Sequence, residues 1–378
     1  MNLSFELGPI RPPSEAQSLL LRLTRNCTWN RCIFCRTYKG QTFSRRKVSE
    51  IKSDIDKVEK TCGLIREISR EKGFGGQVGR EVLVHVYRFC GYDMFHVASW
   101  LYSGGKTVFL QDANSLVMRT ADLVEILQYL KQRLPSVERV TIYGRSDTIL
   151  RKSVEELAEL ARAGLSRIHV GMESGCDEVL KFMEKGITAE QHVKAGLRVK
   201  KAGISLSEYV ILGLGGRRWG REHPLETAEV LNAIDPEFIR LRSIAVAEGT
   251  PLYQKMLDGE FEEQSEEEVV RGERLMIERL DGVRSTLVSD HSLNLLEEVG
   301  GRFPEDKPYM LSVIDRFLSL PERKKQNFIL GKRIGMYRRL DDMLDSMRYY
   351  QVETELYKLE REGLLSSTIA GLKDQLIV

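Results

Sequence analysis

The sequence lacks any run of about 18 apolar residues, the length that a membrane-spanning helix requires. The segment from Met1 to Ser14 also lacks the basic stretch followed by an apolar stretch that marks a secretory signal. We therefore expect a cytoplasmic protein without a membrane partner. With 378 residues, of which 42% are hydrophobic, the chain is long enough for one large core or two unequal domains.

A large net charge is missing as well. The 57 lysine and arginine residues nearly balance the 55 aspartate and glutamate residues, which leaves a formal net charge of +2. Such a balance gives no strong field for attracting a polyanion, and phosphate contacts need basic side chains concentrated on one surface. The composition therefore argues against a nucleic-acid partner and favours a small-molecule substrate, with an RNA substrate as the alternative.

The six cysteines are too unevenly spaced for a disulfide framework, which is typical of small secreted chains. Three of them, Cys27, Cys32 and Cys35, fall within nine residues, and a tight trio in a large chain indicates a metal centre. The other three are isolated, and we interpret them as small buried hydrophobic residues. They are Cys62, Cys90 and Cys176.

Short apolar runs alternate with helical patterns along most of the chain. Strands that alternate with helices of about 10–15 residues indicate right-handed βαβ units and a parallel sheet. Six such units predict an α/β fold, namely a partial (β/α)6 TIM-like barrel or an open sheet. We expect strands at 18–23, 107–111, 139–143, 167–172, 205–212 and 238–245, and helices at 47–70, 120–133, 153–163, 177–202 and 225–234.

Three regions follow from this pattern. We expect residues 1–17 to form an N-terminal extension, 18–255 the barrel core, and 256–378 an α-helical C-terminal region. We expect this last region to act as a cap that shapes the substrate pocket. Between residues 73 and 106 the pattern fits poorly, and we expect one inserted helix around 94–102, between glycine turns. Asp290, His291 and Asn294 form a polar island in the C-terminal region, and we expect them either to reach the substrate pocket or to make ordinary caps and turns.

Polar and glycine residues follow each expected strand. In parallel α/β folds the active site gathers at the carboxyl ends of the strands, so all these residues would face one rim. Arg145 and Arg242 stand at two of these ends, where they would hold an acidic substrate or make ordinary ion pairs. Besides the cysteine trio, the set comprises Asp112, Asn114, Gly144, Arg145, Ser146, Asp147, Glu173, Ser174, Gly175, Gly213, Gly215, Gly216, Glu248, Gly249 and Thr250.

The cysteine trio has the spacing C-x4-C-x2-C. A structural zinc site needs a fourth protein ligand to complete its tetrahedron, and no cysteine or histidine lies close by in sequence. A [4Fe–4S] cluster accepts three thiolates if its fourth iron takes another ligand. The spacing therefore favours a cluster with one open iron. A zinc site, in a structural protein without enzymatic activity, remains the alternative if Cys62 folds back as the fourth ligand.

At this point the sequence resembles the radical S-adenosylmethionine (SAM) superfamily. The loop from Cys27 to Cys35, with the aromatic Phe34 between the last two cysteines, is similar to the superfamily signature. The usual spacing is C-x3-C-x2-C, so this chain carries one extra residue. The resemblance implies that the three cysteines bind a [4Fe–4S] cluster. Its open iron would bind SAM, and reduction would split SAM into methionine and a 5′-deoxyadenosyl radical that takes hydrogen from the substrate.

Three further segments resemble the coproporphyrinogen-oxidase-like and Elongator-like members. The segment 170–175 is similar to a fourth-strand segment whose glutamate contacts SAM, which implies this role for Glu173. The segment 183–188 is similar to one in which a basic residue lies near the SAM carboxylate, and Lys185 stands where arginine is commoner. The segment 211–216 is similar to one that packs near adenine, which implies SAM contacts for Ile211 and Gly213.

The usual second-strand motif, Gly-Gly-Glu, is absent, and residues 111–114 occupy its position. The resemblance then implies that Asp112 and the backbone around Ala113 meet the SAM amino group. It also implies an electron donor such as flavodoxin or ferredoxin, and, by analogy with the Elongator-like members, it keeps RNA modification as an alternative. No second cysteine group is present, which favours a single-cluster oxidoreductase or transferase. No catalytic residue is assigned.

Overall fold

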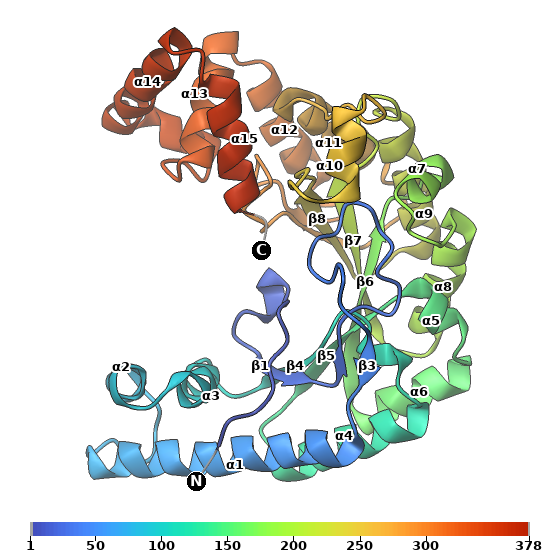
Figure 1. The fold of residues 1–378 in the computed structure, drawn as a ribbon, viewed down its shortest axis with the longest axis vertical. Helices are drawn as coiled ribbons and strands as arrows, with labels where there is room; N and C mark the ends of the chain where they lie inside the picture. Colours follow the sequence, from blue (N-terminus) through green and yellow to red (C-terminus); the bar gives the residue numbers. More distant parts are fainter. Residues whose placement is uncertain (1–2, 377–378) are drawn as a thin grey trace. The chain divides into compact units, whose positions relative to one another are not determined.

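The computed structural model describes residues 3–376, which fall into two compact units (Figure 1). Unit 1 comprises Met1–Trp29, Gly40–Val170 and Arg198–Leu206. Unit 2 comprises Asn30–Lys39, Gly171–Leu197 and Ser207–Val378. The chain therefore passes between the units several times, and the cysteine loop itself is divided, with Cys27 in unit 1 and the other two cysteines in unit 2.

Eight strands form the main sheet, in the order β1-β4-β5-β6-β7-β8-β9-β10. The pairs with a described register are parallel, except for the last pair, β9 and β10, which is antiparallel. The sheet ends at β1 and β10, so the barrel is partial, as predicted. The strands are β1 (Leu19–Arg22), β4 (Thr107–Gln111), β5 (Arg139–Gly144), β6 (Leu165–Glu173), β7 (Ser205–Leu212), β8 (Phe238–Ser243), β9 (Thr286–Val288) and β10 (Gly301–Arg302).

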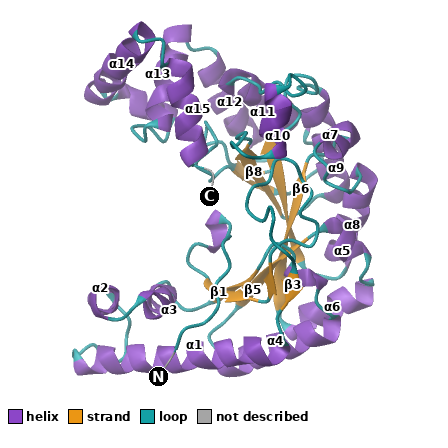
Figure 2. Cartoon of the chain, in the orientation of Figure 1, coloured by secondary structure: helices purple, strands orange, loops and turns teal. Residues whose placement is uncertain are grey.

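Unit 1 holds the first half of the sheet, with its helices following the strands (Figure 2). The long helix α1 packs against α3 and α4. The helices of unit 1 are α1 (Val48–Glu71), α2 (Arg80–Phe89), α3 (Tyr92–Tyr102), α4 (Thr120–Arg133), α5 (Ser146–Leu150) and α6 (Val154–Ala163). Unit 1 also has two 3₁₀ turns, η1 (Pro13–Glu15) and η2 (Ser115–Val117), and a small antiparallel pair of strands, β2 (Thr24–Arg25) and β3 (Ser44–Arg45).

Helix α6 shows how the sequence sets the limits of an element. The Ser153 hydroxyl accepts the backbone N–H of Glu156, and the Glu156 carboxylate accepts the backbone N–H of Ser153. This capping box satisfies two donors that the first helical turn leaves open. The helix ends at Gly164, which has a φ of 118°. Glycine adopts this backbone angle readily, whereas other residues rarely do.

The helix predicted around 94–102 is present as α3, but the structure has a second helix before it, α2, which was not predicted. Gly91, with a φ of 27°, separates α2 from α3. Helix α2 buries Val82 and Val86, which lie four residues apart, while Tyr87 and Phe89 stay exposed.

Unit 2 contains the second half of the sheet and the predicted C-terminal helices. Two short strands, β9 and β10, interrupt the region that the sequence marks as helical, and they extend the sheet beyond β8. The helices are α7 (Asp177–Phe182), α9 (Glu222–Ile234), α10 (Pro251–Leu257), α11 (Glu266–Arg279), α12 (Lys307–Leu318), α13 (Glu322–Arg333), α14 (Ser346–Arg361), α15 (Leu365–Gln375) and the 3₁₀ turn η3 (Leu340–Leu344); α8 (Ala189–Lys201) belongs to both units.

Across residues 3–376, no helix has both the length and the apolar character that crossing a membrane would demand.

Candidate active site

The part of the cysteine loop that belongs to unit 2 is anchored by its apolar residues. Ile33 is buried in a core cluster that also contains Met183, Ile211 and Leu252, and Phe34 packs against the same cluster. The backbone N–H of Ile33 donates to Met183 O (3.2 Å), and Leu252 donates to Ile33 O (3.1 Å). The two residues between the second and third cysteines therefore fix this end of the loop to the core.

The cysteines themselves have the properties of metal ligands. Cys32 is buried, Cys27 and Cys35 are half-buried, and none forms a disulfide. The backbone N–H of Cys35 donates to Cys32 O (3.3 Å), which closes a tight turn between these two residues. Three thiols outside any disulfide, on a loop after the first barrel strand, form a donor set that suits an iron–sulfur cluster.

In unit 1, residues of the second barrel strand hold the chain on both sides of Cys27. The fully buried Asp112 accepts the backbone N–H of Asn26 (3.2 Å) and the Arg22 guanidinium (2.8 Å). On the other side, the Asn114 amide donates to the Thr28 hydroxyl (2.9 Å). Asp112 and Asn114 therefore position the first cysteine, a role that the sequence did not indicate.

The N-terminal extension is part of this arrangement. Glu6 pairs with Arg25 (2.7 Å) and Arg22 (3.2 Å), and the hydrogen bond from Arg25 is the main cause that lowers the pKa of Glu6. The Gln111 amide donates to the carbonyls of Gly8 and Ile10. These contacts join residues far apart in the sequence, so no local pattern could reveal them.

Unit 2 brings Glu173 and Lys185 together. The Lys185 ammonium lies 2.9 Å from Glu173 Oε1, and their side chains are only 8% and 16% exposed. Glu173 has a φ of 68°, in a region that residues other than glycine rarely adopt, at the end of β6. The structure thus places Glu173 and Lys185 side by side. The sequence predicted a SAM contact for each of them from a different segment.

Glu208, on β7, is a buried acid that sequence reasoning missed. Its side chain is almost fully buried, and its Oε2 atom has no hydrogen-bond partner among the described residues. Burial raises the pKa of Glu208 well above its usual value, the charge of Glu173 raises it further, and Lys185 opposes both. The surroundings of Glu208 therefore favour its protonated, neutral form. The sequence did contain a signal for this buried acid, because Glu208 is a single charged residue inside an otherwise apolar strand.

The other predicted SAM residues occupy strand ends. Ala113 is half-buried directly after β4 and Asp112. Ile211 is buried in the same core cluster as Ile33. Gly213 follows β7 with a φ of 78°, and a Cβ atom there would come within 3.0–3.1 Å of Val269 and Ile244. Both the backbone angle and the close packing therefore require glycine at position 213.

Two candidate polar residues have structural partners. Arg145 donates to Asp147 (3.0 Å) and its guanidinium lies 5.3 Å from the centre of the Trp29 ring. Asn294 is buried, accepts the backbone N–H of Ser243 (2.7 Å) and donates to Leu241 O (2.9 Å). Asn294 thus fixes the end of β8. This is the ordinary structural role that the sequence analysis offered as the alternative to a contact with the substrate pocket.

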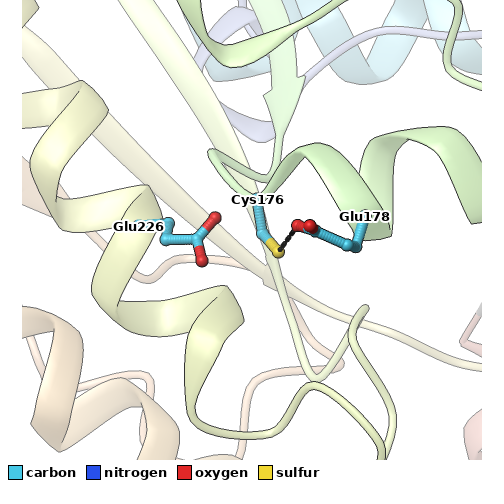
Figure 3. Close-up of side chains that lie close together, drawn as sticks. All are labelled: Cys176, Glu178 and Glu226. Carbon is cyan, nitrogen blue, oxygen red and sulfur yellow. Dashed lines mark hydrogen bonds between the residues drawn. The ribbon is translucent and has the colours of Figure 1, made fainter.

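Of the isolated cysteines, Cys62 and Cys176 are buried, as predicted, whereas Cys90 is only half-buried. Cys62 lies on the buried face of α1, and burial raises the pKa of its thiol to about 11. Cys176 lies between Glu178 and Glu226, and its thiol donates to Glu178 (3.4 Å) (Figure 3). Burial, with help from these acids, raises the pKa of Cys176 to about 12, so it remains a neutral thiol and hydrogen-bond donor.

The fold is an open α/β barrel whose first strand leads into a loop with three cysteines. The model of the radical SAM superfamily matches residues 21–231, more than half of the chain, and the chain belongs to this superfamily. It is therefore an enzyme whose cofactors are a [4Fe–4S] cluster and SAM. This assignment replaces the alternative of a zinc-binding structural protein.

Individual relatives are distant. A tRNA uridine(34) acetyltransferase of Methanocaldococcus infernus is 28% identical over 120 residues, which are 31% of this chain and 22% of that protein. An uncharacterized protein of Methanocaldococcus jannaschii is 27% identical over 132 residues, 35% of this chain and 40% of that one. The chain thus matches well under half of these relatives' lengths. Among solved structures, methylornithine synthase has a TM-score of 0.42 and 16% identity, covering 71% of this chain and 63% of its own.

Proposed function

We propose that this enzyme cleaves SAM reductively and uses the resulting 5′-deoxyadenosyl radical to take a hydrogen atom from its substrate. The observation that carries the proposal is the cysteine loop, with three thiols outside any disulfide after the first strand of a radical SAM barrel. When bound, the cluster supplies the electron that breaks the carbon–sulfur bond of SAM. Cys27, Cys32 and Cys35 are the residues that would hold it.

The remaining residues bind and orient SAM. Lys185 would pair with the SAM carboxylate, and Glu173 would accept hydrogen bonds from the nucleoside or amino group, because the two charges already lie side by side. Asp112 and the backbone at Ala113 would receive the amino group. Ile211 lies at the apolar end of β7, and Gly213 directly follows this strand. Both would therefore pack against adenine.

The substrate and the electron donor are further parts of the proposal. A flavodoxin or ferredoxin would supply the electron. The near-zero net charge favours a small-molecule substrate. RNA is the second candidate, because relatives that match part of the chain are named tRNA uridine(34) acetyltransferases. These relatives therefore do not support the conclusion, drawn from the net charge, that a nucleic-acid substrate is disfavoured. RNA that co-purifies with the enzyme and dissociates steeply with added salt would favour the second candidate.

Replacing Lys185 by methionine is expected to weaken SAM binding about 10-fold or more, since a charge-assisted hydrogen bond contributes roughly 1.5–3 kcal/mol. Lys185→Arg should retain most of the affinity because it keeps the charge. Calorimetric titration of SAM into the cluster-loaded enzyme measures the effect. Lys181→Met is the matched control, because Lys181 is exposed on the adjacent helix α7. Equal affinities for Lys185→Met and the unmodified enzyme would remove Lys185 from the SAM site.

A further inference from the structure

Strand β8 places two arginines on one face of the sheet. Arg240 and Arg242 are two residues apart, and side chains at this spacing in a strand point to the same side. The residues between and beside them, Ile239 and Leu241, are buried and apolar and point to the opposite side. Two positive charges therefore share one face, about 7 Å apart along the strand.

Arg240 is buried with incomplete hydrogen bonding. It is 5% exposed, and its Nε atom has no hydrogen-bond partner among residues 3–376. Its ion-pair partner is Asp290, whose carboxylate is 3.5 Å away and 43% exposed. The guanidinium also lies 5.6 Å from the centre of the Phe238 ring. This contact and the long contact to a partly solvated acid compensate only in part for a buried guanidinium.

The side chain of Arg242 is half-buried and makes neither a hydrogen bond nor an ion pair with any described residue. Its positive charge acts on His291. Burial, followed by the positive charge of Arg242, lowers the pKa of His291 to about 4, so this ring is neutral at pH 7. The ring accepts the backbone N–H of Leu293 at Nδ1 (3.2 Å), which places the ring proton on Nε2. A neutral donor therefore lies beside an uncompensated cation.

We propose that Arg240 and Arg242, with His291, bind an oxyanion of the substrate, a carboxylate or a phosphate group. A guanidinium presents parallel N–H donors that match both groups. Buried cations are normally paired, so the free donors of this face indicate a missing anionic partner.

The location supports a substrate rather than a structural ion. Arg242 is the register partner of Ile211, the residue proposed to pack against the SAM adenine. Arg240 is the register partner of Tyr209 on one side and Val288 on the other. An oxyanion bound here would lie one strand away from the proposed SAM position. The inference therefore rests on the proposed function and adds the chemical class of the substrate.

The test uses phenylglyoxal, which modifies accessible arginines, on the cluster-loaded enzyme, with the modified peptides identified by mass spectrometry. Inorganic phosphate, acetate and a short oligoribonucleotide are the three probes, compared at constant ionic strength. At a concentration of ten times its Kd, a bound probe should slow modification of Arg242 about 10-fold by mass action. The exposed Arg284, which has no side-chain partner among the described residues, is the internal control and should react at an unchanged rate.

The outcomes separate the sources of the oxyanion. Protection by acetate supports a carboxylate, protection by phosphate supports a phosphoryl group, and protection by the oligonucleotide at far lower concentration supports the phosphates of RNA. Replacing Arg240 by glutamine should weaken the protection of Arg242 by any of them. An unchanged rate with all three probes, or equal slowing of Arg284, would overturn the proposal. This measurement needs no SAM cleavage, so its failure is distinct from failure of the proposed function.

Discussion

A Cys32→Ala variant is expected to lose both the iron–sulfur cluster and the formation of 5′-deoxyadenosine. Removal of one of three thiolates leaves two protein ligands, too few to hold a cluster that also needs an open iron. The loss should appear as reduced iron and sulfide content and as loss of the broad visible absorbance after anaerobic reconstitution. Cys27→Ala and Cys35→Ala should behave in the same way.

Cys90→Ala provides the matched control for this prediction. Cys90 is half-buried, as Cys27 and Cys35 are, but it lies at the end of α2, far away in sequence from the cysteine loop. Its replacement should leave iron content and 5′-deoxyadenosine formation unchanged. If Cys32→Ala retained a full cluster, the three cysteines would not be its ligands.

A Glu273→Gln variant is expected to be more stable than the unmodified protein by roughly 3 kcal/mol at pH 7. Glu273 lies on the buried face of α11 with Val270, Met276 and Ile277, and its Oε1 atom has no hydrogen-bond partner among the described residues. Burial raises the pKa of Glu273 from 4.5 to about 8. The folded protein therefore keeps a proton at pH 7 that the unfolded chain releases.

The pH dependence gives this prediction a distinctive sign. Between pH 4.5 and about 8 the folded state binds more protons at Glu273, so the stability of the unmodified protein falls as the pH rises. Glutamine does not titrate, so it removes this contribution. The difference in free energy of unfolding between the two proteins should therefore be near zero below pH 4.5 and grow as the pH rises. Urea unfolding at several pH values measures it. Glu278→Gln, on an exposed side chain of the same helix, should change stability by about 0.5 kcal/mol or less. A pH-independent gap would contradict the account.

The sequence predicted most of the fold because the barrel is built from local, periodic elements. Strands β4 and β7 and helix α4 have the predicted bounds, since each has a continuous apolar or amphipathic pattern with clear ends. Helix α2 and strands β9 and β10 escaped prediction. The helix buries only two apolar residues, and the strands are three and two residues long, too short for any period to emerge.

The candidate site was predictable where a motif carries the chemistry. The cysteine spacing indicated a cluster, and the structure places Glu173 and Lys185 in contact although they are twelve positions apart in the sequence. The position of Cys27 depends on Asp112 and Asn114, which lie more than eighty residues away in the sequence. Such contacts arise only from the order of strands in the sheet. For Arg145, at a strand end, the sequence left open a substrate contact or an ordinary ion pair. The structure shows an ion pair with Asp147 and packing on Trp29.

The most direct test of radical chemistry measures 5′-deoxyadenosine and methionine by mass spectrometry. The enzyme is purified without oxygen, reconstituted with iron and sulfide, reduced, and mixed with SAM. The account predicts that both products form in equal amounts with the unmodified enzyme and that neither forms with Cys32→Ala. A protein that takes up zinc and never assembles an iron–sulfur cluster would contradict it.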